Sequence, residues 1–235
     1  MALNDTDIFS RTIALLGDNA LWRLSAAKII LFGTGGVGSW CAEALVRSGI
    51  THLTLVDFDD VAPSNINRQL PATADTIGQK KVAVLQQRLL SINPNADINI
   101  ITEPFNSDNK DMFRLYEYDY IIDAIDSVAD KADLILTALN TPTSPTLFSS
   151  MGAASKIDSS KIRISTFDKV AGCPLARALR HRFKTIGKMP PRKFLCVWSD
   201  EYIPETPKGT LMYITAAFGL RLAEMVIRDI CNAFA

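Results

Sequence analysis

Short apolar runs alternate with amphipathic stretches along the first two thirds of the chain. Residues 29–32, 53–56, 98–101, 120–126 and 146–149 have the length and composition of strands buried in a sheet. Residues 7–24, 39–48, 107–115 and 131–140 have helical spacing of their apolar positions, as does a stretch that follows Lys81 and ends near Ile92. Repeated strand–helix units of this kind predict an α/β fold with a doubly wound, mostly parallel sheet, similar to a Rossmann fold.

The pattern changes after residue 152. Residues 161–167 alternate like a strand, and residues 172–209 carry five prolines and little periodicity, which predicts a long loop. Residues 210–235 read as an alanine-rich amphipathic helix, better suited to a core or a subunit contact than to a membrane. We therefore expect one domain over residues 1–235. Its nucleotide-binding part spans residues 1–152, and residues 153–235 form a strand, a crossover loop and the C-terminal helix.

A glycine-rich turn separates the first predicted strand from its helix. Gly33 permits a tight turn, Gly35 lets the backbone approach a phosphate, and Gly38 lets the helix pack against the strand. The free N–H groups at the start of that helix would face the phosphates. Asp57 closes the next strand about 20 residues later, where a carboxylate can bind a ribose. This stretch predicts a nucleotide site.

Composition limits the kinds of protein that could carry this site. The 235 residues are 48% hydrophobic and have a formal net charge of zero, so any affinity for nucleic acid must be local. The N-terminal stretch is polar and does not read as a signal peptide. None of the four cysteines forms a CxxC pair, so we expect no zinc site of the usual spacing and a cytoplasmic protein with reduced thiols.

Charged residues at the predicted turns bear on which nucleotide is bound. A dinucleotide dehydrogenase is the default interpretation of the glycine pattern, but it does not need Arg68, Lys81 and Asp126 around the nucleotide. An enzyme that attacks the α-phosphate of ATP needs cations for the triphosphate and the leaving pyrophosphate. A carboxylate such as Asp126 can hold Mg²⁺. These residues favour ATP and Mg²⁺ over a nicotinamide cofactor.

Five motifs in this order resemble the ubiquitin-activating-enzyme-like adenylating family. They are the GTGGVG loop, the Asp57-x-Asp59 strand end, the NINRQ segment at residues 65–69, Lys81, and the DAID segment at residues 123–126. Within that family, the GVGSW and INP segments and LCVWS at residues 195–199 are similar to the tRNA threonylcarbamoyladenosine dehydratase branch. The zinc-binding CxxC pairs of the sulfur-carrier branch are absent.

The resemblance implies a set of ATP-binding residues. The glycines of the loop would wrap the phosphates, and Asn65, Arg68 and Lys81 would contact them. Asp57 would hold the ribose, with Asp59 nearby. Asp126 would bind Mg²⁺ or lie at the α-phosphate. The set is Gly33, Gly35, Gly36, Gly38, Asp57, Asp59, Asn65, Arg68, Lys81 and Asp126. Residues 8–11 resemble the family's N-terminal arginine element, which implies a homodimer in which Arg11 completes the ATP site of the partner. Arg11, Arg68, Lys81 and Asp126 would then be the catalytic residues.

The resemblance also implies a reaction. The carboxylate of N6-threonylcarbamoyladenosine in tRNA would attack the α-phosphate of ATP, and ring closure would then expel AMP with net loss of one water. Ring closure within one molecule benefits from a large effective molarity. The alternative is adenylation of the C-terminus of a ubiquitin-like sulfur-carrier protein, and a nicotinamide oxidoreductase is a weaker third. A cysteine desulfurase or sulfur-acceptor system is a further expected partner.

A basic run in the predicted loop points to the nucleic acid. Residues 171–195 hold seven cations and no acid, with His181, Phe183 and Phe194 interleaved as surfaces for unpaired bases. We expect Arg177, Arg180, Arg182, Lys184 and Lys188 to bind tRNA beside the adenylation site. Cys196 follows the run. Nearby cations could lower its pKa for a thioester step, although a buried structural thiol is the favoured interpretation.

Overall fold

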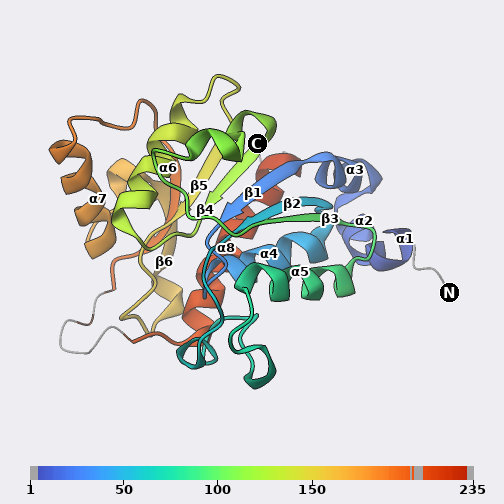
Figure 1. The fold of residues 1–235 in the computed structure, drawn as a ribbon. Coiled ribbons are helices and arrows are strands. Elements are labelled where there is room, and N and C mark those ends of the chain that lie inside the picture. Colours follow the sequence, from blue (N-terminus) through green and yellow to red (C-terminus); the bar gives the residue numbers. More distant parts are fainter. Residues whose placement is uncertain (1–4, 202, 204–208, 232–235) are drawn as a thin grey trace.

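The structure is a computed structural model that describes residues 5–201, 203 and 209–231 (Figure 1). Its core is one seven-stranded sheet in the order β3-β2-β1-β4-β5-β7-β6. All neighbouring strands are parallel except β6 and β7 at one edge, which are antiparallel. The strands are β1 Lys28–Phe32, β2 His52–Val56, β3 Asp97–Ile101, β4 Tyr120–Asp123, β5 Thr146–Ser150, β6 Ile162–Thr166 and β7 Leu195–Ser199. The predicted doubly wound, mostly parallel sheet is confirmed.

Helices cover both faces of the sheet (Figure 1). The helices are α1 Asp5–Ile8, α2 Ser10–Leu16, α3 Asp18–Ala26, α4 Gly38–Ser48, α5 Lys81–Ile92, α6 Val128–Asn140, α7 Pro174–Thr185 and α8 Met212–Cys231. One buried cluster joins Ile29 and Leu31 of β1 to α4, α5 and α8, and a second joins Ile30 and Phe32 to α6 and α7. Successive residues of β1 therefore enter opposite cores, which explains its continuous apolar run.

Two predicted helices differ in detail. The stretch at residues 7–24 is broken into α1, α2 and α3, because Gly17 has a positive φ of 84° and ends α2. The stretch at residues 107–115 forms the 3-10 turns Lys110–Phe113 and Leu115–Glu117 instead of a helix.

The long loop predicted at residues 172–209 is wrong, because it contains α7 and β7. Pro174 occupies the first turn of α7, where its missing N–H is harmless. Ala176, Leu179 and Phe183 share one buried face at helical spacing. The charges on the other face obscured this periodicity in the sequence.

Helix α8 packs closely against the start of α4, next to the glycine loop. A Cβ atom on Gly219 would lie 2.3 Å from the carbonyl oxygen of Val37, so only glycine allows this approach. The same packing brings the side chain of Thr215 to 3.2 Å from the place where Gly36 would carry a Cβ atom. Within the described part of the chain, no helix combines the length and apolar character needed to cross a membrane.

Candidate functional site

The candidate site lies at the carboxyl ends of β1, β2 and β4, where the order of the strands in the sheet reverses. The chain runs from β1 to β2 on one side, while β4 pairs with β1 on the other, and ligands of such sheets bind at this point. Gly33 has a φ of 87°, and a Cβ atom there would lie 2.8 Å from the carbonyl oxygen of Ala124. A Cβ atom on Gly38 would lie 1.8 Å from the oxygen of Gly33. The glycine loop therefore packs directly against the segment that follows β4.

Asp57 holds the glycine loop in shape. Its Oδ2 atom accepts hydrogen bonds from the backbone N of Thr34 at 2.7 Å and from the Thr34 hydroxyl at 3.0 Å. Its Oδ1 atom accepts from the backbone N of Asp59 at 3.0 Å, and the side chain is buried. Because both oxygens already serve the loop, the geometry gives Asp57 a structural role. Its contact with a ribose stays a prediction.

Lys81 and Asp59 form an ion pair at the rim. The Nζ atom of Lys81 lies 2.6 Å from Oδ2 of Asp59, and the backbone N of Lys81 donates to the Asp59 carbonyl. The lysine side chain is only 6% exposed, whereas that of Asp59 is 50% exposed. Lys81 is thus not the exposed rim cation that we expected. It is a buried amine at the first turn of α5, held beneath a carboxylate that faces solvent.

The amide-rich segment at residues 65–69 forms a turn beside the glycine loop. Asn65 is buried and its Oδ1 atom accepts from the backbone N of Ala62 at 3.0 Å, so that oxygen shapes the turn. The guanidinium of Arg68 donates to the carbonyl of Ser64 at 2.8 Å. The Arg68 stem passes 3.3 Å from the place of a Cβ atom on Gly36, so this cation does lie against the glycine loop.

Gln69 is a site residue that our sequence analysis did not select. Its side chain is buried, and its Nε2 atom lies 3.5 Å from the place of a Cβ atom on Gly35. Its Oε1 atom is buried and has no hydrogen-bond partner among the described residues. Buried polar atoms are rarely left without a partner, and the amide nitrogen of the same side chain borders the open space at Gly35, so Gln69 is a candidate ligand contact. The signal was available, since Gln69 ends the NINRQ segment.

Asp126 follows β4 and is supported by a buried ion pair. Lys131 of α6 and Asp123 of β4 are both fully buried, with Nζ 2.8 Å from Oδ2. The same Nζ atom donates to the carbonyl of Ile125 at 3.0 Å, and Oδ1 of Asp123 accepts from the Ile125 backbone N at 3.1 Å. Ser149 donates to Oδ2 at 2.7 Å. The pair therefore fixes both backbone groups of the residue before Asp126.

Asp126 itself is exposed at the carboxyl edge of the sheet. It makes no hydrogen bond or ion pair with any other residue that the structure describes, so its carboxylate is available to a ligand. Within residues 5–201, 203 and 209–231, no cluster of three or more histidine, cysteine, aspartate or glutamate side chains could hold a metal on its own. A metal at Asp126 would therefore need ligands from a bound nucleotide or from water.

Arg11 does not belong to the site of its own chain. It is an exposed residue of α2. That helix lies at the right of Figure 1 on the side where β1 begins, whereas the glycine loop follows the other end of β1. Its predicted role at the ATP site of a partner subunit stays a prediction.

The basic run does not lie beside the site as we expected. It begins at the carboxyl edge, since Gly172 contacts Asp200, but α7 then leads away from that edge. At the far end, Arg192 donates to the carbonyl of Pro145, which precedes β5. Arg177, near the start of α7, is the basic residue closest to the site edge. Lys184 and Lys188 are exposed and lie toward the opposite edge.

Two parts of the tRNA prediction for this run are wrong. Phe183 and Phe194 are buried and pack around Phe167, with Phe194 stacked on it at 5.1 Å between ring centroids, so neither can receive a base. The guanidinium of Arg180 donates to the carbonyls of Phe167 and Val170 at 2.9 and 2.6 Å, which holds the turn before α7. Arg182 is half-buried, and its buried Nε atom has no partner among the described residues.

Cys196 is a buried residue of β7. Burial raises the pKa of its thiol well above the usual value, and this outweighs the opposite effect of Lys131 nearby. The lowered thiol pKa that we considered is therefore wrong, and the structural interpretation of Cys196 is the better one. The other cysteines are also free thiols.

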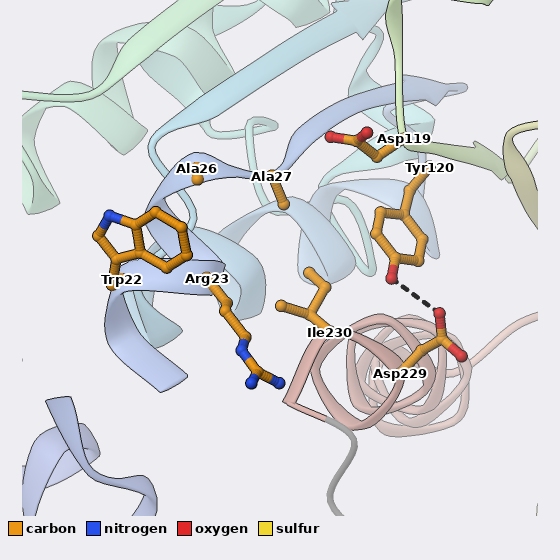
Figure 2. Close-up of a pocket in the computed structure, with 8 residues that line it drawn as sticks. All are labelled: Trp22, Arg23, Ala26, Ala27, Asp119, Tyr120, Asp229 and Ile230. Atoms are coloured by element: carbon orange, nitrogen blue, oxygen red, sulfur yellow. Dashed lines mark hydrogen bonds between the residues drawn. The ribbon is translucent and has the colours of Figure 1, made fainter. Parts of the chain in front are cut away.

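A cavity of about 450 Å³ opens at the opposite edge of the sheet. Figure 2 shows its lining, where Tyr120 donates to Asp229 at 2.7 Å and Trp22 lies at the outer side. It lies at the amino ends of β1 and β4 and contains none of the predicted site residues. The candidate site is thus an open edge of loops and not this cavity.

Comparison with known proteins places this arrangement in a family. The sequence profile of the ThiF family matches residues 9–231. The chain belongs to the ThiF family. The roles of its glycine loop, of buried Lys81 and of exposed Asp126 stay predictions.

Two similar proteins carry one name, tRNA threonylcarbamoyladenosine dehydratase. The chain is 40% identical to that of Haemophilus influenzae over 217 residues, which is 88% of this chain and 82% of the relative. It is also 40% identical to that of Escherichia coli over 177 residues, which is 75% of this chain and 65% of the relative. The crystal structure of the E. coli protein in complex with ATP matches with a TM-score of 0.90 and 34% identity, covering 99% of this chain and 98% of that one.

Proposed function

We propose that this chain is an ATP-dependent dehydratase of N6-threonylcarbamoyladenosine in tRNA. The observation that carries the proposal is the free carboxylate of Asp126, fixed by a buried ion pair directly beside the glycine loop. That arrangement suits attack on the α-phosphate of a nucleotide, and the similar proteins named above act on this nucleoside according to their name. Adenylation of a sulfur-carrier protein is the alternative that the experiment below must exclude.

The residues present fit ATP. Apart from its chain neighbours, the space above Gly35 is bounded within 4 Å only by the side-chain amide of Gln69. Backbone N–H groups of the loop and of the start of α4 would hold the phosphates, with Arg68 and the Lys81 amine supplying positive charge. Asp59, exposed beside Lys81, is the carboxylate best placed for the ribose. Asp126 would hold Mg²⁺ together with phosphate oxygens, and the metal would neutralise charge on the leaving pyrophosphate.

The chemistry then follows from positioning. Attack by the threonine carboxylate on the α-phosphate releases pyrophosphate and leaves a mixed anhydride with AMP. The carbamoyl group of the same nucleoside attacks the activated carbonyl, the C–O bond to AMP breaks, and the proton lost from nitrogen leaves with the departing groups. The chain has to orient the reacting groups and stabilise negative charge, and the cations and N–H groups described above do both.

Mass spectrometry of tRNA nucleosides tests this function. Incubation of the chain with substrate tRNA, ATP and Mg²⁺ should convert the modified adenosine to a product lighter by one water, and omission of ATP should abolish the change. A chain that instead supports exchange of pyrophosphate with ATP only when a small sulfur-carrier protein is present would favour the alternative. Lys81→Ala should remove most activity, and because Lys81 is buried its effect on folding must be measured as well.

We further propose a homodimer in which Arg11 reaches the ATP site of the partner subunit. The support is that Arg11 is exposed and lies on α2, remote from the glycine loop of its own chain (Figure 1). A two-fold dimer would use both arms. Mixing Arg11→Ala chains with Lys81→Ala chains should restore activity, since one site of the mixed dimer is then intact. A mixture as inactive as its parts argues against a shared site.

The exposed basic residues of α7 and the following turn are the proposed surface for the tRNA backbone. The retained part of the prediction rests on Arg177, Lys184 and Lys188, which are exposed. Each phosphate that they neutralise releases a counterion, so replacing all three by alanine should weaken tRNA binding and flatten its dependence on salt. Cytoplasmic location follows from such a substrate. A sulfur-transfer partner gains no support from Cys196, which is buried.

A further inference from the structure

Lys156 is a buried cation that the proposed reaction does not use. It is 4% exposed, and its Nζ atom donates to the carbonyl of Ser199 at 3.4 Å and to the carbonyl of Glu201. No ion pair joins it to a carboxylate of any residue that the structure describes. Burial lowers the pKa of Lys156, as expected for an ammonium taken from water. Lysine is rarely buried without such a pair, so its place needs a reason.

Residues 155–158 around Lys156 hold the chain that leaves β7, and we call them the clamp. The backbone N groups of Ile157 and Asp158 donate to Oε2 of Glu201 at 3.1 and 2.9 Å. The hydroxyl of Tyr213, in the first turn of α8, donates to the carbonyl of Ile157 at 2.6 Å. The clamp therefore binds the connection between β7 and α8 near both of its ends.

The same connection reaches the nucleotide side of the site. The backbone N of Ser155 donates to the carbonyl of Gly209 at 2.9 Å. The next residue, Thr210, accepts from the side chain of Asn67 at 3.0 Å, and Asn67 is the neighbour of Arg68. On this side the bond is made by the backbone of Ser155, whereas the Lys156 ammonium bonds only the carbonyls of Ser199 and Glu201, so its loss acts first on the chain that leaves β7.

The order of the strands shows whether the clamp lies beside the ATP-binding half of the site or beside the half left for the acyl substrate. The glycine loop follows β1 and Asp126 follows β4, whereas the clamp follows β5 and Glu201 follows β7, the next strands in the sheet. ATP with its α-phosphate near Asp126 leaves the β5–β7 side for the molecule that attacks it. The clamp therefore borders the part of the edge that a nucleotide at the glycine loop leaves for the acyl substrate.

We propose that Lys156 is a positioning residue for the tRNA substrate, which fixes the wall of the acyl half of the site through the carbonyls of Ser199 and Glu201. This inference rests on the proposed dehydratase function. Loss of the ammonium should then weaken use of the tRNA substrate and leave ATP binding unchanged. A general structural role would weaken both.

The variant Lys156→Met keeps the length of the side chain and removes its donors. We expect kcat/KM for tRNA to fall about tenfold or more through a higher KM, since small displacements of a positioned substrate are costly. The Kd for ATP should stay within about twofold, because only substrate positioning is altered. Lys156→Arg, which can still donate to both carbonyls, should recover part of the loss. Lys110→Met is the control, since Lys110 is an exposed lysine outside the clamp.

Four outcomes would overturn the positioning role of Lys156 or the proposed function. Unchanged kcat/KM in Lys156→Met overturns the inference, and so does a loss of ATP binding in step with turnover, which would show a structural role only. If Lys156→Met does not fold, Tyr213→Phe removes one hydrogen bond at the other end of the clamp and should raise KM for tRNA without affecting ATP binding; an unchanged KM there overturns the inference. A wild-type chain that binds ATP but leaves tRNA unchanged overturns the proposed function instead, and this inference with it.

Discussion

Replacing Lys131 by methionine tests the buried pair that supports Asp126. Methionine nearly keeps the volume of the lysine stem, so the change removes the ammonium and creates little empty space. The carboxylate of Asp123 would retain the Ser149 hydroxyl at 2.7 Å and the Ile125 backbone N at 3.1 Å, but it would be a buried charge without a cation. Breaking a buried pair costs about 3 to 5 kcal/mol, and the two remaining donors place our estimate near the lower value, at about 3 kcal/mol.

Urea unfolding measured by circular dichroism provides the assay. The unfolding midpoint of Lys131→Met should fall without a change in the slope of free energy against urea, as expected when stability alone changes. In the double variant Asp123→Asn/Lys131→Met, the loss should be smaller than the sum of the single losses, because the two groups act as a unit. Lys161→Met, on the exposed surface, should stay within about 0.5 kcal/mol of the wild type.

The reasoning would be refuted by a loss below about 1 kcal/mol in Lys131→Met, or by additive losses in the double variant. A second readout concerns the site. Because Lys131 holds the Ile125 carbonyl at 3.0 Å, its loss should loosen the segment before Asp126 and lower kcat even at temperatures where the variant is fully folded.

Three further predictions use other parts of the fold. Gly219→Ala should cost about 1 to 3 kcal/mol in urea unfolding, because its Cβ atom would lie 2.3 Å from the Val37 oxygen. Burial raises the pKa of Glu43, but its hydrogen bonds to Arg88 and a second arginine prevail and hold that pKa below the usual value. Glu43→Gln should therefore destabilise the chain by about 1 kcal/mol at neutral pH, and this difference should vanish as pH falls through the lowered pKa. Cys196→Ser should keep its turnover rate, measured on fully folded protein, since a buried thiol with a raised pKa takes no part in catalysis.

Local patterns predicted much of the nucleotide half of the structure because its residues work close together in the chain. The glycine loop, the strand end at Asp57 and the helix that begins near Gly38 each follow from short-range rules about turns and buried strands. The strand predicted at residues 120–126 is too long, because β4 ends at Asp123. Those rules do not predict which groups hydrogen-bond or pair with each charged side chain. The pattern predicts that Asp57 binds a ribose, but it does not show that the carboxylate also accepts hydrogen bonds from Thr34 and Asp59 and so shapes the loop.

The basic run shows why charge in a sequence is a poor guide to where a cation lies. Arg180 and Lys184 are one helical turn apart and look equivalent in the sequence, yet Arg180 is held by two backbone carbonyls and Lys184 is exposed. The difference arises because Arg180 lies over the ring of Phe167, next to the buried face of α7. Burial of that face needs the tertiary packing of α7 against α6, which no local pattern contains. Substitutions of Arg180 should therefore act through folding, whereas those of Lys184 should act through binding of the nucleic acid alone.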